Sequence, residues 1–268
     1  QYNGASGWRL HSFTGASDDH QGSGATVNLA RTGALQDIVL AVTYLLYPDL
    51  PVIRKQIKIS NRSGREVMIE SLDIEKIQVG YTFESSVVYT GYGRNKHLST
   101  YIGNWDDPVM AIHSHAYQAG LILGNESPGV LKRIDYNVTK DLANIGLTHT
   151  TDMYPFRKYI RHGDSWTSPR VFVLPYLHSP GPSRAMNNEL AAFVRRHMGL
   201  RLFENRNRPL FMYNNYNPFG DNFNDTLLIS LSKAAAESGI RQFQVDCGWH
   251  TTEGNKGKQV GWLNNMGD

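Results

Sequence analysis

The first part of the chain, up to about residue 177, alternates short apolar runs with turn residues. The β-branched and aromatic run 37–47 stops at the turn signal Pro48-Asp49-Leu50-Pro51, and the runs 52–59 and 66–74 follow at once. These three runs predict an antiparallel meander. Further short runs follow at 77–83, 86–90, 109–112, 117–123, 130–134 and 170–174. Strands at this density predict a large antiparallel β-sandwich, a supersandwich, over residues 1–181.

The pattern changes after Ser179-Pro180-Gly181-Pro182, which is a rigid break in the chain. Apolar side chains then recur at helical spacing, and Gly199 supplies a stop. The residues of this face are Met186, Leu190, Phe193, Val194 and His197. We therefore expect an amphipathic helix over 183–198, in a linker segment that spans 182–208.

A different architecture begins at Pro209. The short apolar run Leu210-Phe211-Met212-Tyr213 is typical of a buried parallel strand, and a loop with Pro218 and Gly220 follows it. A helix capped by Asn224 or Asp225 then runs to Gly239, and a second strand extends from Ile240 to Val245. Strand, helix and strand at this spacing predict a βαβ unit with a right-handed crossover.

The composition of the chain argues against several classes of partner. Hydrophobic residues make up 40% and charged residues 19% of the chain, and the net charge of +3 comes from interspersed signs. The absence of a Lys/Arg block gives no indication of a nucleic acid or a membrane surface as partner, and no run reaches the roughly 18 apolar residues of a membrane span. The single cysteine, Cys247, excludes an internal disulfide but leaves cytoplasmic and secreted locations open.

The candidate chemistry lies at the tips of the two strands of the βαβ unit, where parallel α/β folds contact ligands. Asp246 ends the second strand; it either caps the next loop or accepts hydrogen bonds from sugar hydroxyls. Trp249 is either a core residue or a platform for a sugar ring. At the tip of the first strand, Asn214, Asn215 and Tyr216 suit polar ligand contacts and equally suit a turn.

The sequence around other reactive side chains gives weaker indications of a catalytic or metal site. Cys247 is either a small buried thiol or a nucleophile assisted by His250, but no oxyanion-hole motif accompanies it. His113 and His115 share one face of a strand, yet no third metal ligand is evident. No metal site and no organic cofactor are therefore expected, since the phosphate-binding, dinucleotide-binding and zinc-protease motifs are absent.

From Pro209 onward the sequence resembles glycoside hydrolase family 36, the α-galactosidase (melibiase) family. The matching residues are Arg208–Tyr216, Lys233–Ile240 and Gln244–Trp249. The resemblance implies a multi-domain chain of β plus α/β class: sandwich (1–181), linker helix (182–208) and the first βαβ unit of an incomplete (β/α)8 barrel (209–268). It also implies that Asp246, Cys247, Trp249, Asn215 and Tyr216 bind substrate, an α-linked oligosaccharide or glycoside.

Two residues depart from the family pattern. Tyr216 stands where the family has tryptophan, and Cys247 stands where the family has a second aspartate. That aspartate pair is implied to hold galactose hydroxyls, and a thiol accepts hydrogen bonds weakly. The sugar therefore stays open between galactose and another α-linked sugar.

The segment from residue 209 onward is too short to form a complete barrel. A complete barrel needs about 250 residues, whereas 209–268 supplies 60. The family's two catalytic aspartates lie on later strands, so the resemblance implies no catalytic residue in this chain. We therefore expect the chain to be a part of a retaining α-glycosidase that is inactive by itself. A homo-oligomer is compatible with this expectation. The alternative from another class is a non-catalytic carbohydrate-binding or structural β-sandwich protein.

Overall fold

The structure is a computed structural model of the chain. It describes residues 7–31, 33, 36–80, 86–90, 95–97, 101–103, 108–127, 129, 131–199, 211–220 and 222–246. The chain divides into two compact units, Gln1–Leu200 and Arg201–Asp268, and each is described by itself.

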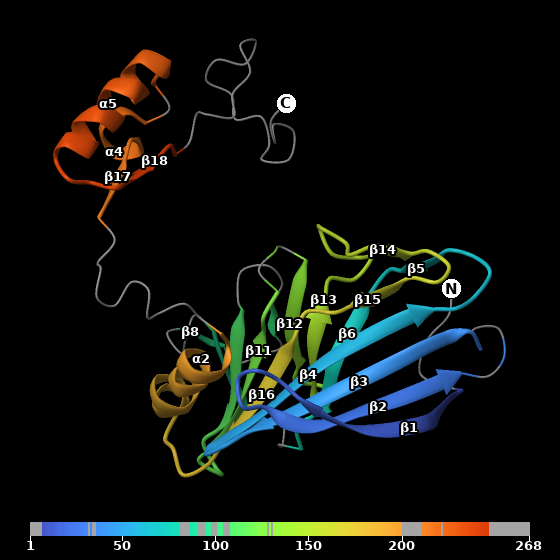
Figure 1. Cartoon of the computed structure of the whole chain (residues 1–268). Helices are drawn as coiled ribbons and strands as arrows, with labels where there is room; N and C mark the ends of the chain where they lie inside the picture. Colours follow the sequence, from blue (N-terminus) through green and yellow to red (C-terminus); the bar gives the residue numbers. More distant parts are fainter. Residues whose placement is uncertain are drawn as a thin grey trace. The chain divides into compact units, whose positions relative to one another are not determined.

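The first unit is built on a large antiparallel sheet, in which ten strands pair among the described residues (Figure 1). The path of the sheet runs β1-β2-β3-β4-β16-β11-β10-β7-β8, and β15 pairs with β4 beside this path. The strands are β1 (Trp8–Ser17), β2 (Ser23–Arg31), β3 (Ile38–Tyr47), β4 (Leu50–Asn61), β16 (Val171–Tyr176), β11 (Ala119–Asn125), β10 (Val109–Ser114), β7 (Ser86–Thr90), β8 (Asn95–His97) and β15 (Ser165–Thr167).

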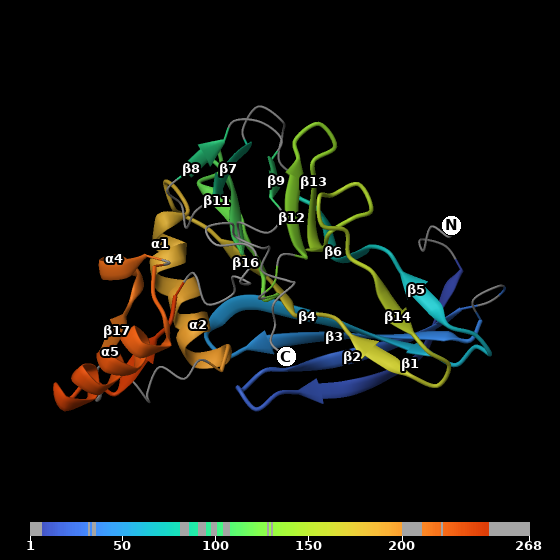
Figure 2. The same ribbon diagram turned by 90° about the horizontal axis from the view of Figure 1, so that it is seen from above.

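A second sheet packs on one face of the first (Figure 2). Its strands are β6 (Leu72–Gln78), β13 (Leu142–Leu147), β12 (Lys132–Asn137) and β9 (Tyr101–Gly103). Met110 and Leu123 of the large sheet share one hydrophobic core with Ile134 and Ile145 of the second sheet. A short pair, β5 (Val67–Ile69) with β14 (Lys158–Ile160), extends this layer, and its Ile160 enters the same core.

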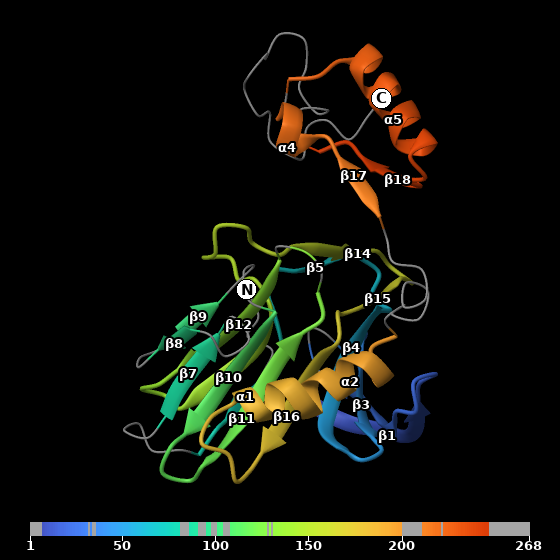
Figure 3. The same ribbon diagram turned by 90° about the vertical axis from the view of Figure 1, so that its left-hand side faces the viewer.

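The helical segment predicted over 183–198 covers the opposite face of the large sheet (Figure 3). It consists of α1 (Ser183–Ala185), a π-helical turn η2 (Met186–Leu190) and α2 (Ala191–His197). Phe193 is fully buried against Phe172 and Leu174 of β16. The large sheet is therefore covered on both faces, by the second sheet on one side and by this helix on the other.

Double coverage explains the uninterrupted apolar runs at 109–112 and 171–174. Successive side chains of a strand point to opposite faces. In β10, Met110 and Ile112 enter the core shared with the second sheet, whereas Val109 and Ala111 enter the core beneath the helix. Because both faces are buried, neither needs polar residues and the usual alternation is lost.

The structure confirms that residues 7–177 are mostly β-sheet, but the predicted three-stranded meander is wrong. Runs 37–47 and 52–59 do pair, as β3 and β4. Run 66–74 breaks into β5 and β6, which pair with the distant strands β14 and β13. β1 and β2 were not predicted, because they are rich in small and polar residues and carry no apolar run. Contacts distant in sequence decided the pairings of β5 and β6.

The second unit contains β17 (Met212–Asn214), α4 (Tyr216–Phe219), α5 (Asp225–Glu237) and β18 (Gln242–Gln244). β17 and β18 pair in parallel, as the βαβ pattern predicts, with Asn214 beside Gln244. The Asn224 side chain caps α5 by accepting a 3.0 Å hydrogen bond from the backbone N–H of Leu227. A short helix, α4, occupies the segment around Pro218 that was expected to be a loop.

A buried polar cluster ties the helix of the first unit to its sheet. Arg54 on β4 donates to Glu126 (Nε to Oε1, 2.7 Å) and, through Nη1, to the backbone oxygen of His197 at the end of α2 (3.1 Å). Tyr47 donates to Asp18 at 2.7 Å. Burial opposes the charge of Asp18, but hydrogen bonds from Tyr47 and from two backbone N–H groups outweigh it and lower the pKa of Asp18. The Arg54 guanidinium therefore compensates two carboxylates that water scarcely reaches.

We expect Arg54→Met to lower the free energy of unfolding by about 3–5 kcal/mol, because it leaves buried carboxylates without a counter-charge. The side chains of Arg54, Asp18 and Glu126 are only 3%, 8% and 12% exposed. Urea denaturation of the whole chain measures the change. Arg62→Met, at an exposed arginine, serves as the matched control and should change stability by less than about 0.5 kcal/mol. Equal effects of the two substitutions would contradict the role of the cluster.

A second ion pair gives stability a pH dependence. His149 Nε2 lies 2.9 Å from Asp73 Oδ1, and both side chains are about a third exposed. The hydrogen bond to Asp73 raises the pKa of His149, against the smaller opposing effect of burial. A raised pKa means that the pair stabilises the folded state fully below the unfolded pKa of about 6.5. The contribution is lost as the pH rises through the folded pKa.

We therefore expect His149→Gln to destabilise the chain more at pH 5.5 than at pH 9. The difference should be about 0.2–1 kcal/mol, because solvent screens a partly exposed pair. Thermal unfolding at both pH values measures it. In an Asp73→Asn background the pH dependence of the substitution should disappear. A destabilisation that grows with pH would contradict the raised pKa of His149.

Candidate functional site

The candidate site lies at the carboxyl ends of β17 and β18. Because the two strands are parallel, their carboxyl ends meet at the same edge of the pair. α5 spans the connection, and Gly239 after it has a φ of +81°, a conformation that glycine adopts readily. Asn214 ends β17, and Asp246 follows β18 by two residues. The predicted residues of the two strand tips are thus brought together by the pairing.

Hydrogen bonds join the two tips. Asp246 Oδ2 accepts from Asn214 Nδ2 at 2.7 Å, and the backbone N–H of Asp246 donates to Asn215 Oδ1 at 2.8 Å. Asn214 Oδ1 also accepts from the backbone N–H of Tyr216 at 2.8 Å. The two asparagines therefore fix the position of the carboxylate and the start of α4.

Burial separates the roles of these residues. Asn215 is fully buried, and its Nδ2 has no hydrogen-bond partner within the part of the chain that the structure describes. Asp246 is half-buried, and the Tyr216 side chain is exposed. The site therefore offers carboxylate oxygens, an amide donor and an aromatic ring, which together suit hydrogen bonding to a hydroxylated ligand.

The structure brings Asn215, Tyr216 and Asp246 together, whereas Cys247 and Trp249 lie outside the described residues. Asn214, which the sequence places at the first strand tip but not among the expected substrate-binding residues, joins this group through its hydrogen bond to Asp246. Its position as the last residue of the first strand was the available signal, because the carboxyl ends of parallel strands meet at one edge. No group of three or more metal-ligating side chains occurs among the residues for which positions are described. In the same residues, no helix is long and apolar enough to span a membrane.

The sequence model of the Melibiase family matches residues 165–266, which include the linker helix and the whole candidate site. Two curated relatives are α-galactosidase 1 of Pediococcus pentosaceus and the probable α-galactosidase C of Aspergillus terreus. The first is 20% identical over 84% of this chain and 32% of its own length. The second is 22% identical over 80% of this chain and 31% of its own length.

Solved structures share the fold. A GH36 α-galactosidase AgaA variant from Geobacillus stearothermophilus, in complex with 1-deoxygalactonojirimycin, superimposes with a TM-score of 0.66 at 14% identity, covering 92% of this chain and 38% of that chain. The α-galactosidase of Lactobacillus brevis gives 0.65 at 15% identity, covering 92% and 37%.

The curated relatives and the solved structures that the chain is similar to are α-galactosidases, a class of glycoside hydrolases. More particularly, the chain resembles the N-terminal part of the family 36 enzymes, which confirms the resemblance found in its sequence. It spans about a third of the length of the curated relatives that it matches.

The second unit should be weakly protected in hydrogen exchange. Phe211 is 73% and Met212 48% exposed, and the parallel pair has only two strands among the described residues. Backbone amides of β17 and β18 should therefore exchange at least about tenfold faster than those of β10 and β11, which are covered on both faces. Mass spectrometry of the exchanging chain measures this. Equal protection of both units in a monomer would contradict the expectation, and protection that increases with protein concentration would show coverage by a second copy.

Proposed function

We propose that this chain is the N-terminal part of a retaining α-glycosidase of α-galactosidase type, which hydrolyses terminal α-linked sugars. Residues 1–181 would form the supersandwich, 182–208 the linker helix and 209–268 the start of a (β/α)8 barrel. The hydrogen-bonded contact of Asp246 with Asn214 and Asn215, at the carboxyl ends of two parallel strands, is the single observation that carries this proposal.

The physics of parallel sheets supports a barrel. Parallel strands occur almost only in sheets covered on both faces, and a parallel pair of two strands is not stable alone. β17 and β18 therefore require further strands, and a barrel supplies them while placing the ligand at the carboxyl ends. Asp246 occupies that face, as a carboxylate that binds sugar hydroxyls would.

The relatives support the substrate class. Structures of the Geobacillus stearothermophilus enzyme include complexes with raffinose and with stachyose. In the proposed enzyme, Asp246 accepts hydrogen bonds from hydroxyls of the scissile sugar. Asn215 orients Asp246 through its backbone, and Tyr216 and Trp249 shape the pocket. Cys247 follows Asp246 in the sequence and, as a thiol, would accept hydrogen bonds more weakly than the aspartate of the family pattern. Activity toward a panel of α-linked glycosides measures which sugar is preferred.

A retaining glycosidase needs two carboxyl groups about 5–5.5 Å apart. The resemblance assigns both to strands beyond residue 268, so the 268-residue chain should not hydrolyse 4-nitrophenyl α-galactoside, α-glucoside or α-N-acetylgalactosaminide. The longer product of the natural reading frame should hydrolyse at least one of them. The release of nitrophenol measures both.

In that longer product we expect Asp246→Asn to lower kcat/KM by about 10- to 100-fold. This corresponds to about 1.4–2.7 kcal/mol, the range for hydrogen bonds to a charged group. Asp225→Asn, at an exposed acid of α5, is the matched control and should leave kcat/KM unchanged. Turnover by the 268-residue chain would contradict the assignment of catalysis to later strands. A natural stop codon directly after residue 268 would instead favour a non-catalytic carbohydrate-binding protein.

A further inference from the structure

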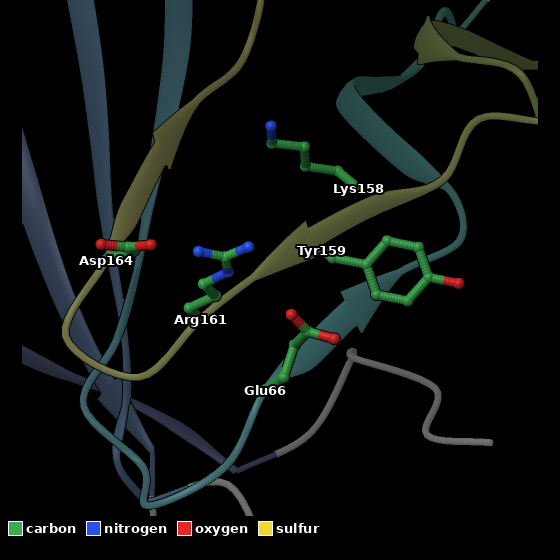
Figure 4. A pocket seen from close by; sticks show the side chains of 5 residues that line it. All are labelled: Glu66, Lys158, Tyr159, Arg161 and Asp164. Atoms are coloured by element: carbon green, nitrogen blue, oxygen red, sulfur yellow. The ribbon is translucent and has the colours of Figure 1, made fainter.

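The first unit contains a cavity on its β5–β14 pair. The cavity has a volume of about 550 Å³ and is lined by Glu66, Lys158, Tyr159, Arg161 and Asp164 (Figure 4). This volume falls within the roughly 300–1,000 Å³ of small-molecule sites. Every lining residue belongs to the first unit, whereas Asp246 belongs to the second.

A buried asparagine holds the two segments that line the cavity. Asn61, which is 1% exposed, donates from its side chain to the backbone oxygens of Arg65 (2.8 Å) and Ile160 (2.9 Å). Its backbone N–H donates to the backbone oxygen of Asp164 at 2.9 Å, and its backbone oxygen accepts from Gly163. His162 further bonds Ser63. The backbone on both sides of the cavity is thus fixed before any ligand arrives, which lowers the entropy lost on binding.

Strand register sets which side chains face outward. Ile160 pairs with Val67 and points into the core, so Tyr159 and its partner Met68 point away from it. Tyr159 is 55% exposed. Extending the pairing by one residue places Glu66 opposite Arg161, on the same outward face as Tyr159. An accessible aromatic ring therefore lies beside a carboxylate and a guanidinium.

The lining combines opposite charges that do not neutralise one another by direct contact. Within the described residues, no ion pair or side-chain hydrogen bond joins Glu66, Lys158, Arg161 or Asp164 to a protein group. The two cations and two carboxylates cancel in net charge. An anionic ligand would meet two carboxylates and a cationic ligand two cations, whereas hydroxyl groups both donate and accept and can use all four.

We propose that this cavity binds a neutral oligosaccharide, at a second site separate from the ends of β17 and β18. The Tyr159 ring packs against the C–H face of one sugar ring. Lys158 and Arg161 donate to hydroxyl oxygens, and Glu66 and Asp164 accept from hydroxyl groups. The site requires no catalysis and does not depend on the proposed glycosidase activity, so the two proposals fail separately.

Isothermal titration of the whole 268-residue chain tests the site, with the neutral trisaccharides raffinose, maltotriose and cellotriose as probes. At least one should bind, and Tyr159→Ala should weaken that binding by at least about tenfold. Tyr159→Phe keeps the ring and should retain the binding. Tyr117→Ala is the matched control, since Tyr117 is 62% exposed and does not line the cavity. Thermal unfolding verifies that each variant is folded.

Asp246→Ala separates the two sites, because it should abolish any binding at the ends of β17 and β18 and leave binding at the cavity. The proposal is overturned if no trisaccharide binds the Asp246→Ala chain, or if binding to that chain survives the further substitution Tyr159→Ala. It is equally overturned if binding is lost in Asp246→Ala and not in Tyr159→Ala. Inorganic phosphate that binds more tightly than every trisaccharide, in a manner dependent on Arg161, would also overturn it, because it would show an anion site.

Discussion

Burial of both faces of the large sheet is the constraint on which the first unit depends. β10, β11 and β16 send alternate side chains into two separate cores, one shared with the second sheet and one beneath α1 and α2. The second sheet closes the first core and the helical segment closes the other. Both cores are attached to the same strands of the large sheet. The helix that leads to the second unit is therefore part of the first unit's packing and is not a loose tether.

The same constraint explains the buried charges. Arg54 extends from β4 toward the end of α2, where the polar backbone oxygen of His197 would otherwise be buried without a donor. Asp18 and Glu126 pair with the guanidinium, and Tyr47 and Phe193 contact it. Hydrogen bonds in this charge cluster are directional, so they fix the position of α2 on the sheet more specifically than apolar packing alone.

The second unit follows a different rule. Its strands pair in parallel, and the tips carry Asn214, Asn215 and Asp246 in one hydrogen-bonded group. The amide side chains converge on a carboxylate, an arrangement that suits hydrogen bonding to a hydroxylated ligand. Here the chain order strand–helix–strand was enough to predict which side chains meet, because a parallel pair always places its carboxyl ends together.

Local pattern therefore determined much of this protein. The helix after Pro182, the cap at Asn224, the pairing of β3 with β4 and the βαβ unit all depend on neighbours within about 30 residues, whose spacing the sequence displays. Pairings such as β5 with β14 and β6 with β13 join segments more than 60 residues apart, and only the tertiary structure decided them. The cavity beside Tyr159 has the same origin, since Asn61 joins its two walls across about a hundred residues. No local pattern encodes such contacts, because their stability comes from a core that many distant residues build at once.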